Sequence, residues 1–319
     1  MKLACVGNAL LDVIAFVDQD LPTSLGLHPG STNHVDKATM DRVVSSIHHS
    51  VQTAGGGAAN TARAFSALGG VAAFAGAVGD DAEGRRYASD MQAAGITPLV
   101  SMLKQSTGIF LAMISPDGMR TVVVHTGAAA HFSPQAVPDA FFSPDAVLYA
   151  DGFLASEPER LRGLIERGKA EGMRVALDVG GHRLASANAD FFRQLIRSSC
   201  DWVFMNEDEF VALAGGPVDA CLKDFSARAK AQVLVKRAEV GSVCWHDGQV
   251  VESPVRAIRA VDSTGAGDGF SAGFLAAALS GWPLARCMRM GNRVAEYVIQ
   301  VPAMSLEPAR LRAAFTEML

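Results

Sequence analysis

The sequence has no paired cysteines and no long apolar runs. Its five cysteines stand singly in a chain of 319 residues, with no C-x-x-C spacing. This pattern excludes a disulfide framework and the common zinc-binding motifs. No run of 18 apolar residues predicts a membrane span, and no apolar targeting stretch precedes Cys5. We therefore expect a cytoplasmic protein that works in a reducing compartment and has no membrane partner.

The chain also lacks an excess of positive charge and a P-loop. Its formal net charge is −5, which gives no general attraction to nucleic acid or anionic membranes. No lysine is followed by Ser or Thr, which excludes the Walker-type phosphate loop. Any anionic ligand must be held by local positive groups, so a small molecule is favoured over a polymer. The 49% of hydrophobic residues is enough to build a large core.

Strand-like and helix-like segments alternate along most of the chain. The apolar run 2–7 predicts a buried strand, and the alternation from residue 145 onward predicts a parallel sheet covered on both faces. Two apolar helices, about 267–280 and 284–300, complete this α/β pattern. The later strands are predicted at 146–150, 174–178, 202–205 and 233–236, followed by an edge hairpin of 242–246 and 249–252.

A second, smaller sheet is predicted beside the large one. Residues 107–114 and 119–125 are predicted to form a hairpin, because the Ser-Pro-Asp-Gly sequence between them is typical of a turn. Extended stretches near 13–17 and 31–35 are assigned to the same sheet. We expect a single domain over residues 1–319 with a β-lid built from segments of about 12–36 and 99–126.

The strongest motif is DSTGAGD at residues 262–268, which precedes an apolar helix. Small residues at a helix start expose backbone N–H groups, and the helix dipole adds partial positive charge there. The N–H groups of Gly265, Ala266 and Gly267 could therefore hold a phosphate during phosphoryl transfer. Asp268 could accept the proton of an attacking hydroxyl. The spacing alone fits a tight turn and a favourable first-turn acid equally well.

A second motif, GGGAANTA at residues 55–62, opens another helix. Its glycines allow backbone amides to approach a ligand, and the Asn60 amide can bond to hydroxyls. It fails as a dinucleotide fingerprint because Asn60 stands where the last glycine is required. A flexible loop with a helix cap is the alternative interpretation.

Polar residues also follow two of the predicted strands. Asn8 and Asp12 follow the first strand, and Asp12 lies in the apolar stretch 10–16, where an unpartnered carboxylate is costly. This favours a polar ligand for Asp12 over a cap. Asn206 and Glu209 belong to an acidic cluster after a later strand; local pattern favours an N-cap, with magnesium held through water or phosphate as the alternative.

Taken together, these stretches resemble the PfkB or ribokinase-like carbohydrate kinases over essentially the whole chain. The family signature D-T-x-G-A-G-D matches residues 262–268, with Ser263 as a departure, and a glycine run followed by A-x-N-x-A matches residues 55–62. Asn206 and Glu209 match the family's N-x-x-E. The resemblance implies a ribokinase-like three-layer αβα sandwich, with a central mostly parallel sheet and a small β-sheet lid.

The resemblance also implies roles for individual residues. Asp268 would be the catalytic base, and the amides of Gly265, Ala266 and Gly267 the anion hole. The cofactors implied are ATP and Mg²⁺, with Asn206 and Glu209 acting on the metal indirectly and K⁺ as a further candidate ion. The first glycine of the family's G-x-x-G loop is replaced by Ala238. Acceptor contacts are implied for Asn8, Asp12, Gly56, Gly57, Asn60 and Arg120, and nucleotide contacts for Asn206, Glu209, Lys236, Gly241, Thr264 and Asn292.

Softer matches resemble the adenosine-kinase-like bacterial branch of the family. They are Gly7–Ala9 with Asp12, Arg120-Thr121 before Gly127–Ala129, and Asp151–Leu154. They favour a nucleoside such as adenosine, phosphorylated at its primary hydroxyl, whereas Asp178–His182 departs from that branch. The alternatives are a free sugar such as ribose, fructose or a keto-deoxy sugar acid, and a non-catalytic ligand sensor. A monomer and a homodimer are both compatible with the sequence.

Overall fold

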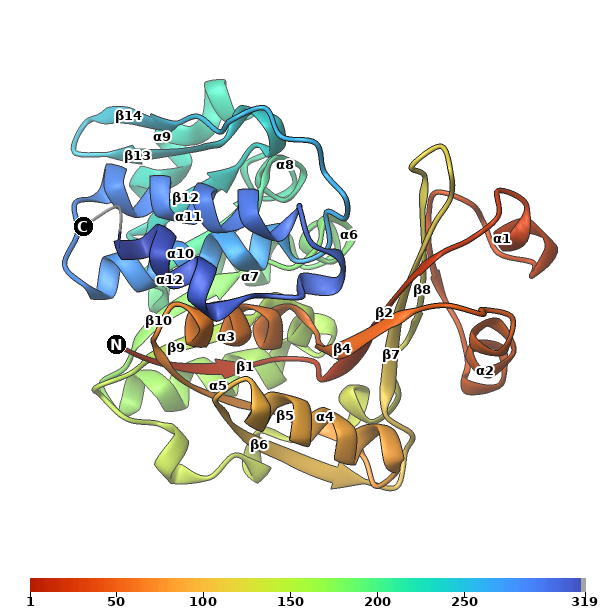
Figure 1. Ribbon diagram of the computed structural model, residues 1–319. Coiled ribbons are helices and arrows are strands. Elements are labelled where there is room, and N and C mark those ends of the chain that lie inside the picture. Colours follow the sequence, from red (N-terminus) through yellow and green to blue (C-terminus); the bar gives the residue numbers. More distant parts are fainter. Residues whose placement is uncertain (317–319) are drawn as a thin grey trace.

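A nine-stranded sheet forms the centre of the molecule, described over residues 1–316 of a computed structural model (Figure 1). Seven neighbouring strands are parallel, and the last two add an antiparallel edge. This confirms the predicted mostly parallel sheet with its edge hairpin. In spatial order the strands are β14 (Gln249–Ser253), β13 (Ser242–His246), β12 (Gln232–Lys236), β11 (Trp202–Asn206), β10 (Arg174–Asp178), β9 (Val147–Asp151), β1 (Lys2–Val6), β5 (Val71–Gly79) and β6 (Ile96–Leu103).

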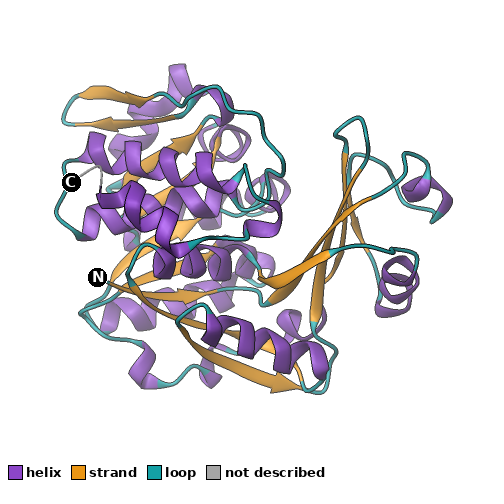
Figure 2. Ribbon diagram, viewed as in Figure 1, coloured by secondary structure: helices purple, strands orange, loops and turns teal. Residues whose placement is uncertain are grey.

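Helices cover both faces of this sheet, which confirms the three-layer αβα architecture (Figure 2). Successive residues of a strand point to opposite faces, so in β1 Leu3 and Cys5 enter one core while Ala4 and Val6 enter the other. Both faces are apolar for this reason. One layer contains α3 (Gly57–Ala67), α4 (Ala82–Ala93), α10 (Ala266–Leu279), α11 (Leu284–Val298) and α12 (Pro308–Thr316); the other contains α5 (Pro158–Ala170), α6 (His182–Ala187), α7 (Ala189–Ser199), α8 (Glu207–Ala214) and α9 (Val218–Ala229).

Helices α10 and α11 pack closely because glycines face the contact. A β-carbon on Gly273 would lie 2.7 Å from the Met290 carbonyl oxygen, and one on Gly269 would lie 2.8 Å from the Val298 side chain. Gly291 of α11 meets the Phe270 ring in the same way, at 2.8 Å. The two helices therefore approach closely along these glycines, which fixes the start of α10 relative to α11.

A second sheet of five strands stands apart from the large one (Figure 1). Its outer face packs against α2 (Lys37–Ser45) through an apolar cluster that includes Val13, Met40 and Leu111. The short helix α1 (Leu21–Ser24) lies on the same side. The strand order is β3 (Thr32–His34), β8 (Arg120–His125), β7 (Gly108–Ile114), β2 (Leu10–Phe16) and β4 (Val51–Gly55).

The small sheet differs from the predicted lid in two respects. Strand β4 belongs to it, although residues 51–55 lie outside both predicted lid segments. Residues 99–103, which the sequence assigned to the lid, belong to β6 and pair with β5 in the large sheet.

All five cysteines are free. Within residues 1–316, no helix has the length and apolar character that crossing a membrane requires.

Candidate active site

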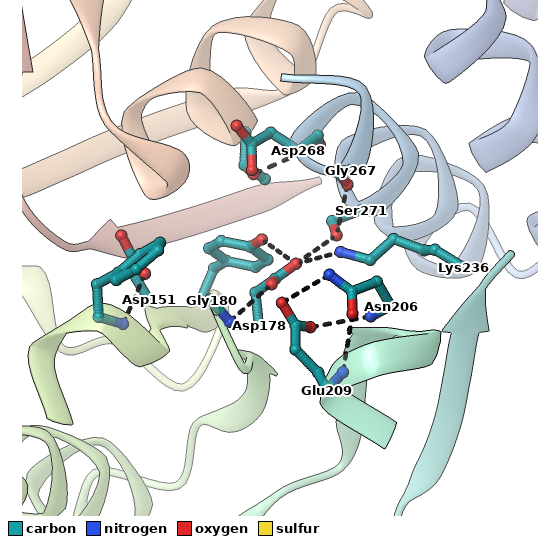
Figure 3. Close-up of polar contacts among 12 residues, drawn as sticks. Asp151, Asp178, Gly180, Asn206, Glu209, Lys236, Gly267, Asp268 and Ser271 are labelled. Carbon is teal, nitrogen blue, oxygen red and sulfur yellow. Dashed lines mark hydrogen bonds and ion pairs between the residues drawn. The ribbon is translucent and has the colours of Figure 1, made fainter. Parts of the chain in front are cut away.

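Polar side chains gather where the parallel strands of the large sheet end (Figure 3). Asp151 ends β9, Asp178 ends β10, Asn206 ends β11 and Lys236 ends β12. The carboxyl edge of an open α/β sheet is the usual position for a ligand site. The start of α10, with Asp268 in its first turn, faces this group of side chains.

The start of α10 offers unpaired backbone donors. Gly265 precedes the helix in a left-handed conformation (φ 76°), and a β-carbon there would overlap the sulfur of Met304, so glycine is required. The Ala266 N–H donates to the Ser263 carbonyl at 3.3 Å. Within residues 1–316, the N–H groups of Gly267 and Asp268 have no acceptor. The Gly265 N–H also has no acceptor within residues 1–316, so the free donors for an anion are the amides of Gly265, Gly267 and Asp268, and not that of Ala266.

Asp268 is half-buried among other carboxylates. Burial raises its pKa well above the ordinary value, the charge of Asp178 raises it further, and Lys236 partly offsets both. A β-carbon on Gly57 would lie 3.5 Å from Asp268 Oδ1 and 3.4 Å from Asp151 Oδ2. Both carboxylates therefore lie close to Gly57 at the start of α3. Asp268, a proton acceptor of raised pKa, thus lies beside the start of this helix.

A buried ion pair lies next to the start of α10. Lys236 Nζ is 2.8 Å from Asp178 Oδ2, which also accepts hydrogen bonds from the Tyr149 hydroxyl and the Ser271 hydroxyl, both at 3.2 Å. A β-carbon on Gly267 would lie 3.1 Å from Lys236 Nζ. The ammonium group is thus held beside the free amides of α10 (Figure 3). The positive charge of Lys236 and the partial positive charge of the helix dipole would therefore both act on an anion bound at the start of α10.

Asn206 and Glu209 form a capping box at the start of α8. The Glu209 N–H donates to Asn206 Oδ1 at 2.8 Å, and the Glu209 carboxylate accepts from the Asn206 backbone and side-chain amides at 2.9 Å each. Burial raises the pKa of Glu209 to about 7, while Lys236 lowers it and Asp178 raises it. The local interpretation as an N-cap is therefore confirmed. Each carboxylate oxygen of Glu209 accepts one hydrogen bond from Asn206.

A second polar group lies where the small sheet meets α3. The Asn60 side chain donates to Asp12 Oδ2 at 3.0 Å, and both residues are buried. Burial raises the pKa of Asp12 to about 6, against the lowering effects of Asn60, Arg63 and the Gly56 amide. A β-carbon on Gly55 would overlap the Asp12 carboxylate, so the close approach of β4 requires glycine there. The buried carboxylate suits a ligand that donates hydroxyl groups.

Asn8, Gly56 and Arg120 border this second group. A β-carbon on Gly56 would overlap the Asn8 carbonyl oxygen. Gly56 also has a φ of 94°, so both this contact and the backbone conformation require glycine. Arg120 stacks over the Phe110 ring at 5.4 Å, and the charges of Asp262 and Asp12 act on its guanidinium. Its Nε is buried without a hydrogen-bond partner within residues 1–316.

The order of these groups along the chain agrees with a known family. The profile of the pfkB family carbohydrate kinases matches residues 2–309. The chain belongs to this family. Its members transfer a phosphoryl group to an alcohol acceptor, so the chain is an ATP-dependent kinase that acts on a nucleoside or a sugar.

Relatives of this kinase include enzymes named for both kinds of acceptor. A ribokinase of Arabidopsis thaliana is 29% identical over 78% of this chain and 67% of its own length. A nucleoside kinase of Methanocaldococcus jannaschii is 26% identical over 94% of this chain and 90% of its own. The crystal structure of an adenosine kinase from Sinorhizobium meliloti superposes with a TM-score of 0.86 at 29% identity, covering 100% of this chain and 99% of that one.

The remaining predicted nucleotide contacts of the kinase lie near its antiparallel edge. Asn292 of α11 is buried and donates to the Ser253 carbonyl and hydroxyl at 2.7 and 3.0 Å. A β-carbon on Gly241 would overlap that same carbonyl oxygen. Ala238, in the turn η5 (Ala238–Val240), has a φ of 45°, which is the left-handed conformation that glycine adopts freely. Thr264 lies apart from this edge, with its N–H and hydroxyl bonded to Asp262 Oδ1.

Sequence reasoning missed three side chains of the kinase site. Asp178 was named only within a segment that departs from the adenosine-kinase-like branch of the family. Asp151 was named only within a segment that resembles that branch. Asp151 is buried, its Oδ2 has no hydrogen-bond partner within residues 1–316, and burial raises its pKa to about 7. Arg63 lay inside an apparently ordinary helix. The position of Asp151 and Asp178 at strand ends was the one available signal.

Proposed function

We propose that this kinase transfers the γ-phosphoryl group of ATP to the primary hydroxyl of a nucleoside, with Asp268 as general base. The observation that carries the proposal is the meeting of α3 and α10. The Thr61 hydroxyl of α3 donates to the Asp268 carbonyl at 3.4 Å, and Gly57 of the same helix borders the Asp268 carboxylate. Helix α3 also carries Asn60, so one short helix links the hydroxyl-binding group to the base.

Asp268 removes the acceptor proton as the hydroxyl oxygen bonds to phosphorus and ADP leaves. The raised pKa of Asp268 favours this transfer, because a carboxylate of higher pKa holds a proton more strongly. The N–H groups of Gly267 and Asp268 stabilise the charge that spreads over the transferred oxygens. Lys236 adds a positive charge beside Gly267. Asp178 holds that ammonium group in position through its 2.8 Å ion pair.

Bound Mg²⁺ would neutralise phosphate charge. The residues present fit such an ion held indirectly, through water or phosphate, with Asn206 and Glu209 nearby. Within residues 1–316, no group of three or more His, Cys, Asp or Glu side chains could hold a metal directly. Gly241, Thr264 and Asn292 complete the proposed nucleotide side. K⁺ stays a candidate activator with no residues assigned to it.

The inner face of the small sheet favours a nucleoside over a free sugar. In the β2–β7 pairing Phe110 lies directly opposite Asp12, and Arg120 stacks on the Phe110 ring. Ile14 and Ile114 extend the apolar surface on the same face. Asp12 and Asn60 would bind ribose hydroxyls, and the aromatic ring would cover a nucleobase. The relatives named as nucleoside and adenosine kinases agree with this choice.

A free sugar is the second candidate acceptor, favoured by the ribokinase relative. In either case we propose that the small sheet, the β-lid, closes over the acceptor, because an open site would transfer phosphate to water. We place the kinase in the cytoplasm, as a monomer or homodimer, where its five free cysteines would stay reduced.

An ADP-release assay with ATP and Mg²⁺ tests the proposal. Purified protein is screened against adenosine, other nucleosides, ribose, fructose and a keto-deoxy sugar acid, in KCl and in NaCl. We expect the highest kcat/KM with a nucleoside. The Asp268→Asn variant should keep the fold, as judged by circular dichroism, and lose about 10²- to 10⁴-fold in kcat. Full turnover in that variant would remove Asp268 from the mechanism, and a clear preference for a free sugar would replace the acceptor.

A further inference from the structure

Arg63 connects the neighbouring elements β4 and α3 to a turn near the end of the chain. Its side chain is largely buried and donates to the Ala54 carbonyl at 3.1 Å, to Asn60 Oδ1 at 3.3 Å and to the Met304 carbonyl at 3.1 Å. The acceptors lie on β4, on α3 and in the turn η6 (Pro302–Met304). The planar guanidinium group reaches these acceptors from two separate nitrogens, whereas a lysine would have to donate from a single nitrogen.

On the acceptor side, Arg63 fixes the orientation of Asn60. Because Asn60 Oδ1 accepts from Arg63, the amide nitrogen must point toward Asp12, to which it donates at 3.0 Å. An unconstrained asparagine amide could present either end to the carboxylate or to a ligand. Arg63 therefore sets which donors and acceptors Asp12 and Asn60 offer to hydroxyl groups.

On the phosphate side, the turn that Arg63 holds lies against the α10 loop. The Met304 side chain packs where a Gly265 β-carbon would stand. The neighbouring Ala303 N–H donates to Asp262 Oδ2 at 3.0 Å. The other oxygen of Asp262 accepts from the N–H and hydroxyl of Thr264 at 2.9 and 2.6 Å. A continuous series of bonds and contacts thus joins Arg63 to the residues that precede the free amides.

The conformation of the turn η6 also depends on contacts with residues outside the turn. Ala303 and Met304 have φ values of 49° and 48°, a left-handed conformation that is unfavourable for non-glycine residues. Such a turn persists only when its surroundings determine it. Arg63, Asp262 and the Thr53 hydroxyl, which donates to the Ala303 carbonyl at 3.4 Å, supply that support.

We infer that Arg63 is a positioning residue that couples acceptor binding at Asp12 and Asn60 to the order of the phosphate-binding loop at Thr264–Asp268. A hydroxyl ligand that fixes Asp12 and Asn60 also fixes the Arg63 guanidinium, which holds η6 against Gly265. The loop is then ordered for the nucleotide phosphates. The inference rests on the proposed function for the identity of the two ligands, and not for the connection between the two sites.

Matched arginine variants test this coupling. Arg63→Met removes the charge and the donors, whereas Arg63→Lys keeps the charge and loses the planar fork. Arg86→Met is the control, because Arg86 anchors the same strand through Gln52 at 2.9 Å and makes no hydrogen bond to η6. The dissociation constant of the ATP analogue AMP-PNP with Mg²⁺ is measured by calorimetry, with and without saturating adenosine, and in parallel with D-ribose.

In the wild type and in Arg86→Met, we expect the acceptor to tighten AMP-PNP binding about fivefold or more. In Arg63→Met and Arg63→Lys the factor should fall to about one. An undiminished factor in either Arg63 variant, including Arg63→Lys alone, would overturn the inference. Absence of ADP release by the wild type with every acceptor would instead reject the proposed function.

Hydrogen exchange gives a ligand-free readout that keeps the inference testable in that case. Amides of residues 264–268 should exchange about tenfold faster in Arg63→Met than in the wild type or in Arg86→Met, because the loop loses its support. Amides in the core of β9 and β10 should exchange at the wild-type rate, which separates local loosening from general destabilisation. Unchanged exchange at residues 264–268 would contradict the proposed connection.

Discussion

Replacing Asp12 by asparagine is expected to make the folded protein more stable above about pH 6 while weakening its hold on the acceptor. Asp12 is 4% exposed, and burial raises its pKa from 3.8 to about 6. The folded state therefore holds this proton more tightly than the unfolded state does. The stability that this provides is fully present below about pH 4 and is lost as the pH rises through about 6.

The pKa shift fixes the size of the effect. A shift of about two units corresponds to about 3 kcal/mol between the protonated and ionised limits. The introduced asparagine could still accept a hydrogen bond from the Asn60 side chain, but it carries no charge that burial could disfavour. Between pH 5 and pH 8 the wild type should therefore lose about 1 to 1.5 kcal/mol relative to the variant.

Urea unfolding at pH 5, 6, 7 and 8 measures this difference. Asp151 and Glu209, whose pKa values are also raised by burial to about 7, are present in both proteins, so their contributions cancel in the comparison. The same variant should raise KM for the acceptor, because a carboxylate accepts more strongly from hydroxyls than an amide does. A difference in stability that does not change with pH, or a variant less stable at pH 8 than the wild type, would refute the reasoning.

Three further substitutions test other parts of the site. Gly265→Ala should lower the free energy of unfolding by about 1–3 kcal/mol and reduce kcat, because its φ of 76° and the Met304 sulfur exclude a β-carbon; wild-type values would contradict this. Ala238→Gly should raise the stability by up to about 1 kcal/mol in urea, since it removes the strain of a φ of 45°. Lys236→Met should cost about 3–5 kcal/mol by leaving Asp178 unpaired, and adding Asp178→Asn should recover most of that loss in thermal unfolding.

The large sheet could be predicted from the sequence because its signals are local. Each of its later strands is a short apolar run bounded by helical patterns, and parallel pairing follows from that alternation. Strand β4 was not predicted because Gln52 and Thr53 interrupt its apolar sequence. Its position beside β2 depends on the close contact between Gly55 and Asp12. Residues 99–103 of β6 were assigned to the lid because the sequence does not reveal which neighbour they pair with.

The parts of the site that belong to a contiguous sequence motif could be predicted. The parts in which side chains far apart in the sequence contact each other could not. The helix start at residues 265–268 and the Asn206–Glu209 pair lie in contiguous sequence. The contact between Asp178 and Lys236 joins residues 58 positions apart, and that between Arg63 and Met304 joins residues 241 positions apart. No local pattern encodes such pairs, because each depends on how the layers pack.

The glycine contact between α10 and α11 has a consequence for which part of the kinase moves. Sliding α10 along its axis would drive the Gly273 backbone into the carbonyl of Met290, so the helix start behaves as a stationary reference point. We expect displacement during turnover to fall on the five-stranded sheet, whose inner face would approach from outside. The alcohol would then be carried to the phosphate, while helix α10 itself stays where the core anchors it.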